Sequence, residues 1–262
     1  MQYFHSWSGG KDSTAAIILD HENGLPPSKI VFSEVMFDIK REISGELPEH
    51  IDFVTKTAKP LFESWGYKVD IVRADRDYID TFFHVIQTSK ITERNGKFRA
   101  WCIGGMCAAN RDLKIKPIQE YYKRLSLAGT EYTQYVGIAI DEPERLERLK
   151  GTNKVSLLAE FGYTEKMAYD LCEKYNLLSP TYKISKRGGC WFCPNQSYAE
   201  LAYIKTTYPE LWAELRELNK EENVVSRGFK YGKTLEEVEE LVEAEIRDQF
   251  FAAQQQSLFD FI

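Results

Sequence analysis

Residues 3–19 read YFHSWSGGKDSTAAIIL, and this stretch decides the fold. Its first five residues, Tyr3 to Trp7, are apolar and aromatic, as in a short buried strand. The apolar run from Ala15 to Leu19 begins a helix. Between them lies a turn that contains two glycines and a lysine. A strand, a glycine-rich turn and a helix in this order are typical of the first βα unit of a parallel sheet.

The turn itself, residues 8–14, has the chemistry of a phosphate cradle. Its two glycines let backbone N–H groups approach an oxyanion, and the following helix directs its free amides and positive dipole end to the same place. Lys11 adds a full positive charge. The turn is not a Walker A loop, because His5 stands where that motif has its first glycine and Asp12 where it has Ser or Thr. The alternative is a capped turn that binds no ligand.

The rest of the chain predicts an α/β domain followed by helices. Within the first 160 residues, apolar runs predict strands at 29–37, 67–72 and 134–140, and helical periodicity predicts helices at 48–65, 78–87 and 113–125. Residues 88–112 are irregular. Beyond residue 160 we expect helices without strands, at 164–175, over 197–221 and from Thr234 onward. Strands that alternate with helices indicate a parallel sheet with right-handed crossovers, followed by a C-terminal helical extension.

The expected domain boundaries follow from this change of pattern. Residues 1–160 form the α/β domain, residues 161–218 a helical, cysteine-bearing extension packed on it, and residues 219–262 a charged linker with a C-terminal amphipathic helix. The apolar stripe of that helix is suited to contact a partner protein or another copy of the chain. The alternative is that the helix packs on its own domain.

Composition and charge set further limits. The 262 residues are 43% hydrophobic and 28% charged, which excludes collagen-like and wholly disordered chains. No apolar run approaches the ~20 residues that span a bilayer, and no signal peptide precedes the first strand, so we expect a cytoplasmic protein with no membrane contact. The net charge of −6 offers nucleic acid no general attraction.

Any nucleic-acid contact must therefore use a local basic patch. The cations near the two cysteine-bearing loops are the candidates for binding tRNA or DNA as an acceptor: Lys114, Lys116, Lys183, Lys186 and Arg187. Solvated surface charge is the alternative. Trp101, Trp191 and Phe192 stand beside these charges, where they would stack on a base or shield a metal centre from water.

The five cysteines are expected to be reduced in the cytoplasm. Cys190 and Cys193 form a CxxC next to glycines and a proline, and Cys102 and Cys107 lie in a second glycine-rich segment. Four thiolates from two loops suit tetrahedral Zn²⁺ or a 4Fe–4S cluster. A redox pair at the CxxC, or four small buried residues, are the alternatives. Cys172, in the middle of a predicted helix, is expected in the core.

Several motifs carry a resemblance to a known family. SGGKDST, directly after the first strand, resembles the PP-loop of the adenine nucleotide α-hydrolase superfamily, which includes ATP pyrophosphatases, tRNA thiolation enzymes and phosphoadenosine-phosphosulfate (PAPS) reductases. Further segments are similar to the PAPS-reductase-like branch: VMFD at 35–38 with ELPE at 46–49, RDLKIKPI at 111–118, VGIAIDEPER at 136–145, and GGCWFCP at 188–194. The last resembles the G-C-x-x-C-P loop of phage and bacterial members. The resemblance implies that residues 1–160 are a PP-loop nucleotide-binding domain with a Rossmann-like parallel sheet.

The resemblance also implies a set of site residues. It implies an adenine nucleotide, ATP or PAPS, bound by Ser8, Gly9, Gly10, Lys11, Asp12, Ser13, Thr14, Met36 and Asp38. Mg²⁺ would offset the phosphate charge through Asp12 or Asp38. The catalytic candidates are Lys11, Asp12, Arg145 and Arg187, although the two arginines would equally suit surface ion pairs. Asp141 and Glu142 would bind metal or cap the helix that follows.

The expected reaction departs from that of the reductases. They use a nucleophilic cysteine near the C-terminus, and this sequence has no cysteine after Cys193. We therefore expect cleavage of ATP between the α and β phosphates, with sulfur transfer to the activated acceptor supported by a cysteine-bound metal centre. Resemblance favours 4Fe–4S over zinc, although the adjacent Cys-Cys pair of many reductases is absent from the sequence. The alternatives are a PAPS or APS reductase and a nucleotide-binding regulatory subunit with structural zinc.

Overall fold

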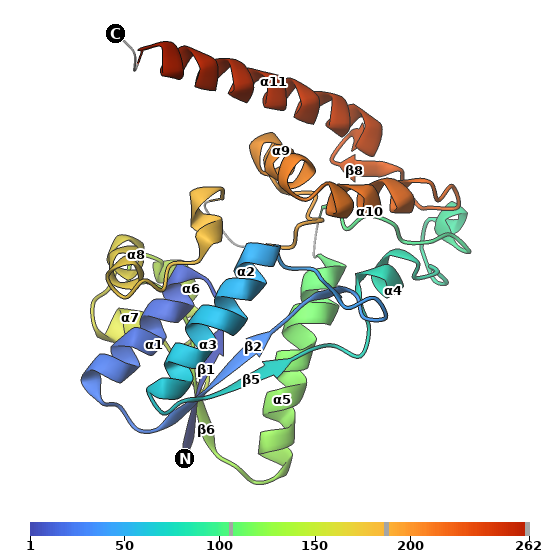
Figure 1. The fold of residues 1–262 in the computed structure, drawn as a ribbon. Helices are drawn as coiled ribbons and strands as arrows, with labels where there is room; N and C mark the ends of the chain where they lie inside the picture. The colour runs from blue at the N-terminus through green and yellow to red at the C-terminus, as the bar shows by residue number, and fades with distance from the viewer. Residues whose placement is uncertain (105–106, 186–188, 260–262) are drawn as a thin grey trace. The chain divides into compact units, whose positions relative to one another are not determined.

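The computed structural model describes residues 1–104, 107–185 and 189–259, with side chains up to residue 252. The chain forms two compact units (Figure 1). Unit 1 comprises Met1–Asp77 and Asn110–Gly189, and unit 2 comprises Tyr78–Ala109 and Cys190–Ile262. These boundaries differ from those expected at residues 160 and 218. Residues 78–109 join the C-terminal part because the backbone of Phe98 bonds to Asn223, with an N–O distance of 2.9 Å.

Unit 1 is built on a five-stranded parallel sheet, which confirms the predicted α/β class. The strand order is β5-β2-β1-β6-β7, so β1 lies in the middle. The strands are β1 (Gln2–Trp7), β2 (Ser28–Ser33), β5 (Lys68–Val72), β6 (Tyr132–Tyr135) and β7 (Lys154–Val155). A separate antiparallel pair joins β3 (Met36–Asp38) to β4 (Ile43–Ser44).

The alternation of side chains along the strands explains how both faces of this sheet are covered (Figure 1). Trp7 and Phe32 face a core that they share with the apolar side chains of α1, and Phe4 faces Tyr122 on the opposite side. The helices of unit 1 are α1 (Lys11–Asn23), α2 (Pro48–Asp52), α3 (Lys59–Ser64), α5 (Lys116–Leu127), α6 (Pro143–Glu147), α7 (Leu157–Glu160) and α8 (Glu165–Lys174). Helix α5 covers the Phe4 face, and α1, α2, α3, α7 and α8 lie on the other.

Several predicted elements have different bounds in the structure. The strand expected at 134–140 ends at Tyr135. The chain after it, at Gly137, packs directly against the backbone of the first turn of α1. The strand expected at 29–37 divides into β2 and β3. The helix expected at 48–65 is continuous, but residues 53–58 form a π-helical segment between α2 and α3. The helix expected at 113–125 has Pro117 in the first turn of α5, as predicted.

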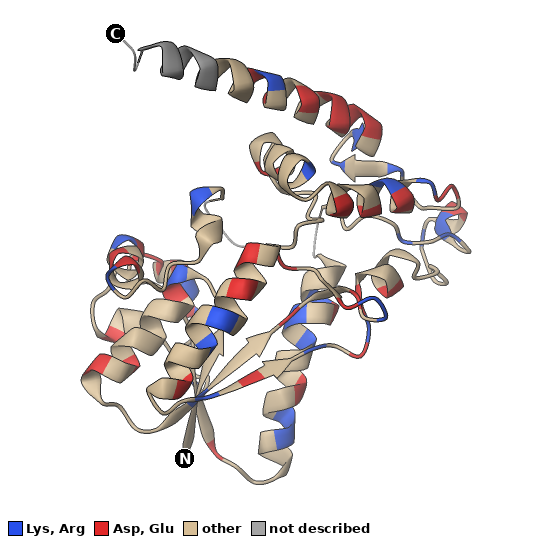
Figure 2. Cartoon of the chain, viewed as in Figure 1, with Lys and Arg blue, Asp and Glu red and all other residues tan. Residues whose placement is uncertain are grey.

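Unit 2 contains α4 (Tyr78–Phe82), α9 (Tyr198–Thr207), α10 (Pro209–Asn219), β8 (Gly228–Lys230), β9 (Lys233–Thr234) and α11 (Leu235–Phe259). The helix expected at 78–87 is shorter than predicted. The β8–β9 hairpin corrects the expectation of helices without strands beyond residue 160. Leu235, Val238 and Val242 of α11 are buried, so the first half of this helix packs within its own unit, although acidic residues line its outer face (Figure 2). Partner contact through its second half stays a prediction.

The described residues contain no helix with the length and apolar character that crossing a bilayer requires.

Candidate functional site

The predicted phosphate loop lines a cavity of about 320 Å³ in unit 1. The cavity lies where β1 ends and α1 begins, the edge of a parallel sheet at which ligands bind in open α/β folds. Its lining residues come from segments far apart in the sequence: Ser8, Gly10, Lys11, Asp12, Ser13, Glu46, His50, Lys114, Gly137, Arg145, Glu165 and Tyr182. Five of the predicted nucleotide-binding residues are therefore in the lining, together with Arg145.

The loop holds its shape through its own hydroxyl groups. The backbone N–H of Ser8 donates to Ser13 Oγ at 3.2 Å, and Ser13 Oγ donates to the Gly10 carbonyl at 3.1 Å. The Gly10 N–H in turn contacts Ser8 Oγ at 3.3 Å. The amides of Asp12 and Ser13 stand in the first turn of α1, where no carbonyl of the helix can accept from them. The turn is thus pre-organised, with helix amides at the cavity.

Gly9 is required by both its conformation and its surroundings. Its φ of +73° lies in the left-handed region that favours glycine. A Cβ at this position would stand 2.6 Å from Cε1 of His50 and 3.1 Å from Cγ2 of Val54. The side of the loop away from the cavity is therefore packed against α2 and the segment after it.

Gly137 is required for a different reason. A Cβ on Gly137 would lie 2.4 Å from the backbone nitrogen of Ser13 and 2.6 Å from the carbonyl carbon of Asp12. The chain after β6 therefore touches the backbone of the first helical turn directly. This contact fixes the position of that turn, and it explains why glycine stands in the VGIAIDEPER segment.

Lys11 and Asp12 carry opposite charges at the cavity wall. Lys11 Nζ lies 2.8 Å from Asp12 Oδ1 and 3.3 Å from Glu165 Oε2. Burial opposes the charge of Lys11, but the two carboxylates outweigh it and raise its pKa. Burial, together with the nearby carboxylates of Glu165 and Glu142, raises the pKa of Asp12 despite the ion pair with Lys11. The wall therefore crowds carboxylates around one ammonium.

The other two cations of the cavity are also paired. Lys114 Nζ lies 3.4 Å from Oε1 of Glu46, whose side chain is buried. Arg145 forms an ion pair with Glu142, one turn earlier in the chain. The predicted surface ion pair of Arg145 is thus present, and the same side chain lines the cavity.

His50 and Tyr182 are site residues that the sequence did not reveal. His50 Nε2 lies 3.3 Å from the carbonyl of Ser8, so it donates there, and Nδ1 accepts from the Ser179 hydroxyl at 2.8 Å. Burial lowers the pKa of His50, which keeps the imidazole neutral for this arrangement. The backbone N–H of Lys11 donates to the Tyr182 hydroxyl at 2.8 Å. No local motif marks either residue, because both reach the loop from distant segments.

Thr14, Met36 and Asp38 are not in the cavity lining. Thr14 is fully buried, and its hydroxyl accepts from the Trp7 indole at 2.9 Å. Met36 is buried in β3, and Asp38 pairs with Arg41; neither is in the cavity lining. Arg187 falls outside the described residues, as does Lys186 of the predicted basic patch.

The acidic residues after β6 accept hydrogen bonds from backbone amides. Asp141 Oδ1 accepts from the backbone N–H of Glu165 at 3.1 Å, at the first residue of α8. Glu142 Oε2 accepts from the Ala139 N–H at 3.2 Å. The expected capping of the helix that follows is not present, because the side chain of Glu142, at the N-cap of α6, accepts no hydrogen bond from the backbone N–H groups of that helix's first turn.

Both cysteine pairs belong to unit 2. The Cys102 thiol shares a hydrogen bond with Cys107, which together with burial raises the pKa of Cys102. Cys190 and Cys193 form a turn in which the Cys193 N–H donates to the Cys190 carbonyl at 3.0 Å. Tyr78, buried next to this region, stacks on Phe192 with a centroid distance of 3.9 Å.

Each of the four thiols lies within electrostatic range of Tyr78. Burial, and then the charge that each of the four cysteines would carry, raise the pKa of Tyr78 well above its usual value. Trp191 and Phe192 are buried, which suits shielding rather than base stacking. Among the residues that the structure describes, however, no three His, Cys, Asp or Glu side chains are placed to hold a metal ion. Cys172 is buried in unit 1, in the core position expected.

Comparisons with known proteins add little to this geometry. No known family profile matches the chain. An uncharacterized protein of Methanocaldococcus jannaschii is 23% identical over 235 residues, which are 86% of this chain and 50% of that protein. The chain thus spans half the length of this curated relative. The structure of a PAPS reductase from Candida auris, in a phosphate complex, is similar with a TM-score of 0.42 and 14% identity, over 73% of this chain and 82% of that chain. Neither similarity is strong enough to assign a family or a function.

Proposed function

We propose that unit 1 is a PP-loop adenine-nucleotide enzyme that cleaves ATP between its α and β phosphates to activate an acceptor for sulfur transfer. In this reaction an acceptor oxygen attacks the α phosphorus, the bond to the β-phosphate oxygen breaks, and pyrophosphate leaves. The observation that supports the proposal is the cavity in which the first turn of α1 meets the Lys11 ammonium. A preformed set of helix amides and one ammonium suits the charge of a phosphate chain.

The residues of the cavity suggest separate roles. The loop amides and Lys11 would hold phosphoryl oxygens. Arg145 would place its positive charge beside the leaving pyrophosphate once its ion pair with Glu142 breaks. Asp12 and Glu165 supply carboxylate oxygens of the kind that Mg²⁺ prefers. Their crowding around Lys11 would be relieved by a divalent cation that arrives with the nucleotide. Of the two carboxylates proposed for Mg²⁺, Asp12 lines the cavity and Asp38 does not.

A thiol-dependent reduction of PAPS is less well supported by unit 1. Its one cysteine, Cys172, is buried and donates to the Lys11 carbonyl at 3.2 Å. Burial raises the pKa of this thiol to about 12, so it is protonated and a poor nucleophile. Cys172 therefore supports the position of the loop rather than covalent chemistry.

The test is product analysis with the full chain. We expect pyrophosphate and an adenylylated acceptor from ATP and Mg²⁺, and AMP when a sulfur nucleophile then displaces it from the acceptor, with tRNA and DNA as the first acceptors to try. Formation of ADP would contradict the proposal. A parallel reaction with PAPS and thioredoxin addresses the reductase alternative, for which sulfite is the diagnostic product. Sulfite release, with no pyrophosphate from ATP, would replace the proposed reaction.

We also propose that Cys102, Cys107, Cys190 and Cys193 of unit 2 hold a metal centre, 4Fe–4S or Zn²⁺. Four thiols around one buried tyrosine fit such a centre by donor chemistry, although the thiols would have to draw together on binding. Metal analysis and the absorption spectrum of anaerobically purified protein test this. We expect Cys190→Ser to lose the metal and Cys172→Ser, the matched control in unit 1, to retain it. Metal-free wild-type protein would overturn the proposal.

A further inference from the structure

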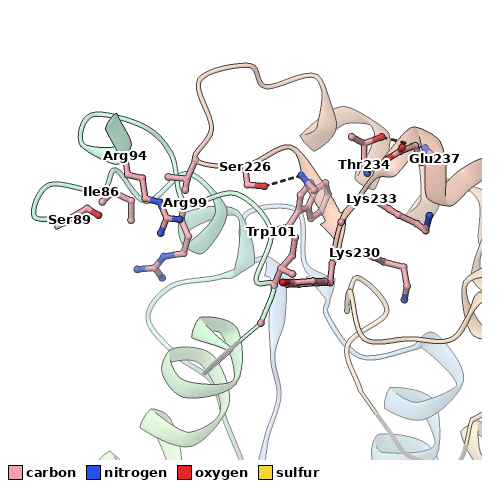
Figure 3. A pocket seen from close by; sticks show the side chains of 16 residues that line it. Ile86, Ser89, Arg94, Arg99, Trp101, Ser226, Lys230, Lys233, Thr234 and Glu237 are labelled. Atoms are coloured by element: carbon pink, nitrogen blue, oxygen red, sulfur yellow. Dashed lines mark hydrogen bonds between the residues drawn. The ribbon is translucent and has the colours of Figure 1, made fainter. Parts of the chain in front are cut away.

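A second cavity lies in unit 2 and differs from the first in its chemistry. It measures about 700 Å³ and lies between the segment before the first cysteine pair and the β8–β9 hairpin (Figure 3). Four cationic side chains line it, Arg94, Arg99, Lys230 and Lys233, with one carboxylate, Glu237. In a protein with a net charge of −6, this is a strong local excess of positive charge.

Three of these cations have no acidic partner among the residues that the structure describes. Among the ion pairs of the described residues, none involves Arg94, Arg99 or Lys233. The carboxylate of Glu237 is already engaged, because its Oε2 accepts from the Thr234 N–H at 2.7 Å and so caps α11. The three cations are therefore available to an anion that enters from outside.

Lys230 has a structural role in the same wall. Its ammonium donates to the Pro194 carbonyl at 2.8 Å and also bonds to the carbonyl of Gln196. It thereby joins the hairpin to the loop that contains Cys193, which rigidifies this wall of the cavity.

Aromatic side chains accompany the charges. Trp101 lines the cavity between Arg94 and Arg99 on one side and Lys230 and Lys233 on the other (Figure 3), but it is only 6% exposed and offers little surface to a base. Tyr231, at the tip of the hairpin, also lines it and is 93% exposed. So large an exposed ring costs the protein solubility and gains no packing, but it offers a face on which a base can stack.

We propose that this cavity binds a single-stranded polynucleotide. Cations on both sides of a cavity that also exposes the Tyr231 ring match a strand, which carries a phosphate on each side of every internal base. A mononucleotide carries phosphate on one side of its base and would leave one set of cations unused. The site stands in unit 2, so this inference is independent of nucleotide cleavage in unit 1. If both proposals are correct, the bound polynucleotide would be the acceptor of the reaction in unit 1.

Fluorescence anisotropy with the full chain tests the proposal, in the absence of ATP and Mg²⁺. The probes are a short fluorescein-labelled oligouridylate and the matching oligothymidylate. We expect the triple variant Arg94→Ala/Arg99→Ala/Lys233→Ala to bind at least tenfold more weakly. The slope of log affinity against log salt should fall by about 2, because each lost phosphate contact removes ~0.7 from it. Binding of either oligomer with these effects supports the proposal, and the ratio of the two affinities identifies RNA or DNA.

The control triple Lys56→Ala/Lys150→Ala/Lys166→Ala removes the same charge from exposed, ion-paired positions of unit 1. It should leave the affinity within about twofold of the wild type. Tyr231→Ala should lose about tenfold by the loss of stacking, and Tyr231→Phe should retain wild-type affinity. The proposal is overturned if the wild type binds neither oligomer, if the control triple loses as much as the test triple, or if AMP displaces the oligomer as effectively as unlabelled oligomer does.

Discussion

The cavities of the two units both present lysine and arginine side chains, but they balance the charge differently. Each cation in the lining of the unit 1 cavity has a carboxylate partner: Lys11 with Asp12, Lys114 with Glu46, and Arg145 with Glu142. The cations Arg94, Arg99 and Lys233 of unit 2 pair with none of the described carboxylates. A balanced wall suits a small ligand that brings its own counter-ion, whereas an unbalanced wall suits a polyanion that releases counter-ions on binding.

The two cavities also differ in the space around their glycine residues. In unit 1, Gly9 and Gly137 bring the loop into contact with its surroundings at distances that leave no room for a Cβ. In unit 2, a Cβ on Gly232 of the hairpin turn would meet no atom within 4 Å. The unit 1 loop therefore leaves no space for an added methyl group, whereas the turn of the unit 2 hairpin has space for one, so substitutions should affect the two in different ways.

The largest effect should follow Gly9→Ala. A methyl group 2.6 Å from the His50 ring forces the loop or the ring to move, and overpacking of this kind costs roughly 1–3 kcal/mol in addition to the strain of a positive φ. We expect ATP affinity, measured by isothermal titration calorimetry, to fall on the order of 100-fold. Gly24→Ala is the matched control, because Gly24 has φ of +56° and open surroundings. The control should lose stability through the same backbone strain but bind ATP as the wild type does; equal affinities for the two variants would refute a rigid loop.

Lys11→Ala should have the next largest effect. The substitution removes the ammonium and leaves Asp12 and Glu165 facing the nucleotide phosphates without a counter-charge. A hydrogen bond to a charged group is worth roughly 1.5–3 kcal/mol, so ATP affinity should fall about 10- to 100-fold. Lys166→Ala, on α8 of the same unit, removes an exposed lysine paired with Asp170 and should have no measurable effect. A wild-type affinity in Lys11→Ala would exclude the loop as the phosphate site.

Sequence reasoning recovered the part of unit 1 that local patterns encode. The strand, the loop and α1 are contiguous, and their apolar periodicity and glycines predict the turn and its anion chemistry directly. The contacts of His50 and Tyr182 with the loop could not be predicted, because they depend on tertiary packing across 42 residues for His50 and Ser8 and 171 for Tyr182 and Lys11. The same distance between segments explains why Thr14 was assigned to the ligand, when its hydroxyl instead bonds to Trp7 in the core.

The basic cavity of unit 2 was even less accessible to sequence reasoning. Its two walls come from segments more than 120 residues apart, which are joined by the backbone hydrogen bond from Phe98 to Asn223. The basic residues near the irregular segment 88–112 were the available signal. The predicted basic patch instead included Lys114 and Lys116, which form ion pairs with Glu46 and Glu120 in the structure. Clustered charges in sequence thus proved a poor guide to unpaired charges in space.

Added salt should weaken ligand binding at the two sites by different amounts, and we expect the difference to be moderate. If three phosphates contact the unit 2 cations, raising salt from about 50 to about 200 mM should weaken oligouridylate binding roughly 20-fold. The cations of unit 1 exchange one set of anionic partners for another when ATP binds, so ATP affinity at fixed Mg²⁺ should fall much less over the same range. Parallel titrations of the two ligands measure both slopes. Identical slopes would contradict the contrast between balanced and unbalanced walls.

The smallest expected effect is a pH dependence confined to unit 1. Burial lowers the pKa of His5, although its hydrogen bond with Asp20 at 2.6 Å opposes the shift, and burial lowers the pKa of His50 as well. Below a pH of about 6.5 the unfolded chain takes up protons that the folded unit does not, so stability falls as the pH decreases and is unaffected above that value. Unit 2 contains one histidine, His84, which is exposed. Amide hydrogen exchange, corrected for intrinsic rates, should therefore show protection in unit 1 decreasing from about pH 7 to about pH 5.5 while unit 2 changes less.

His5→Gln should flatten that dependence, because glutamine keeps a polar group near Asp20 and has no proton to gain. His21→Gln is the matched control: His21 lies on the surface of α1, stacked on Trp65 with a centroid distance of 4.1 Å. It should leave the slope of stability against pH unchanged. Each kcal/mol lost on acidification should lower the Tm by roughly 2–4 °C, which calorimetry resolves. If His5→Gln and the wild type lose protection in parallel, His5 is not the source of the acid sensitivity of unit 1, and His50, whose pKa burial also lowers, would have to account for it.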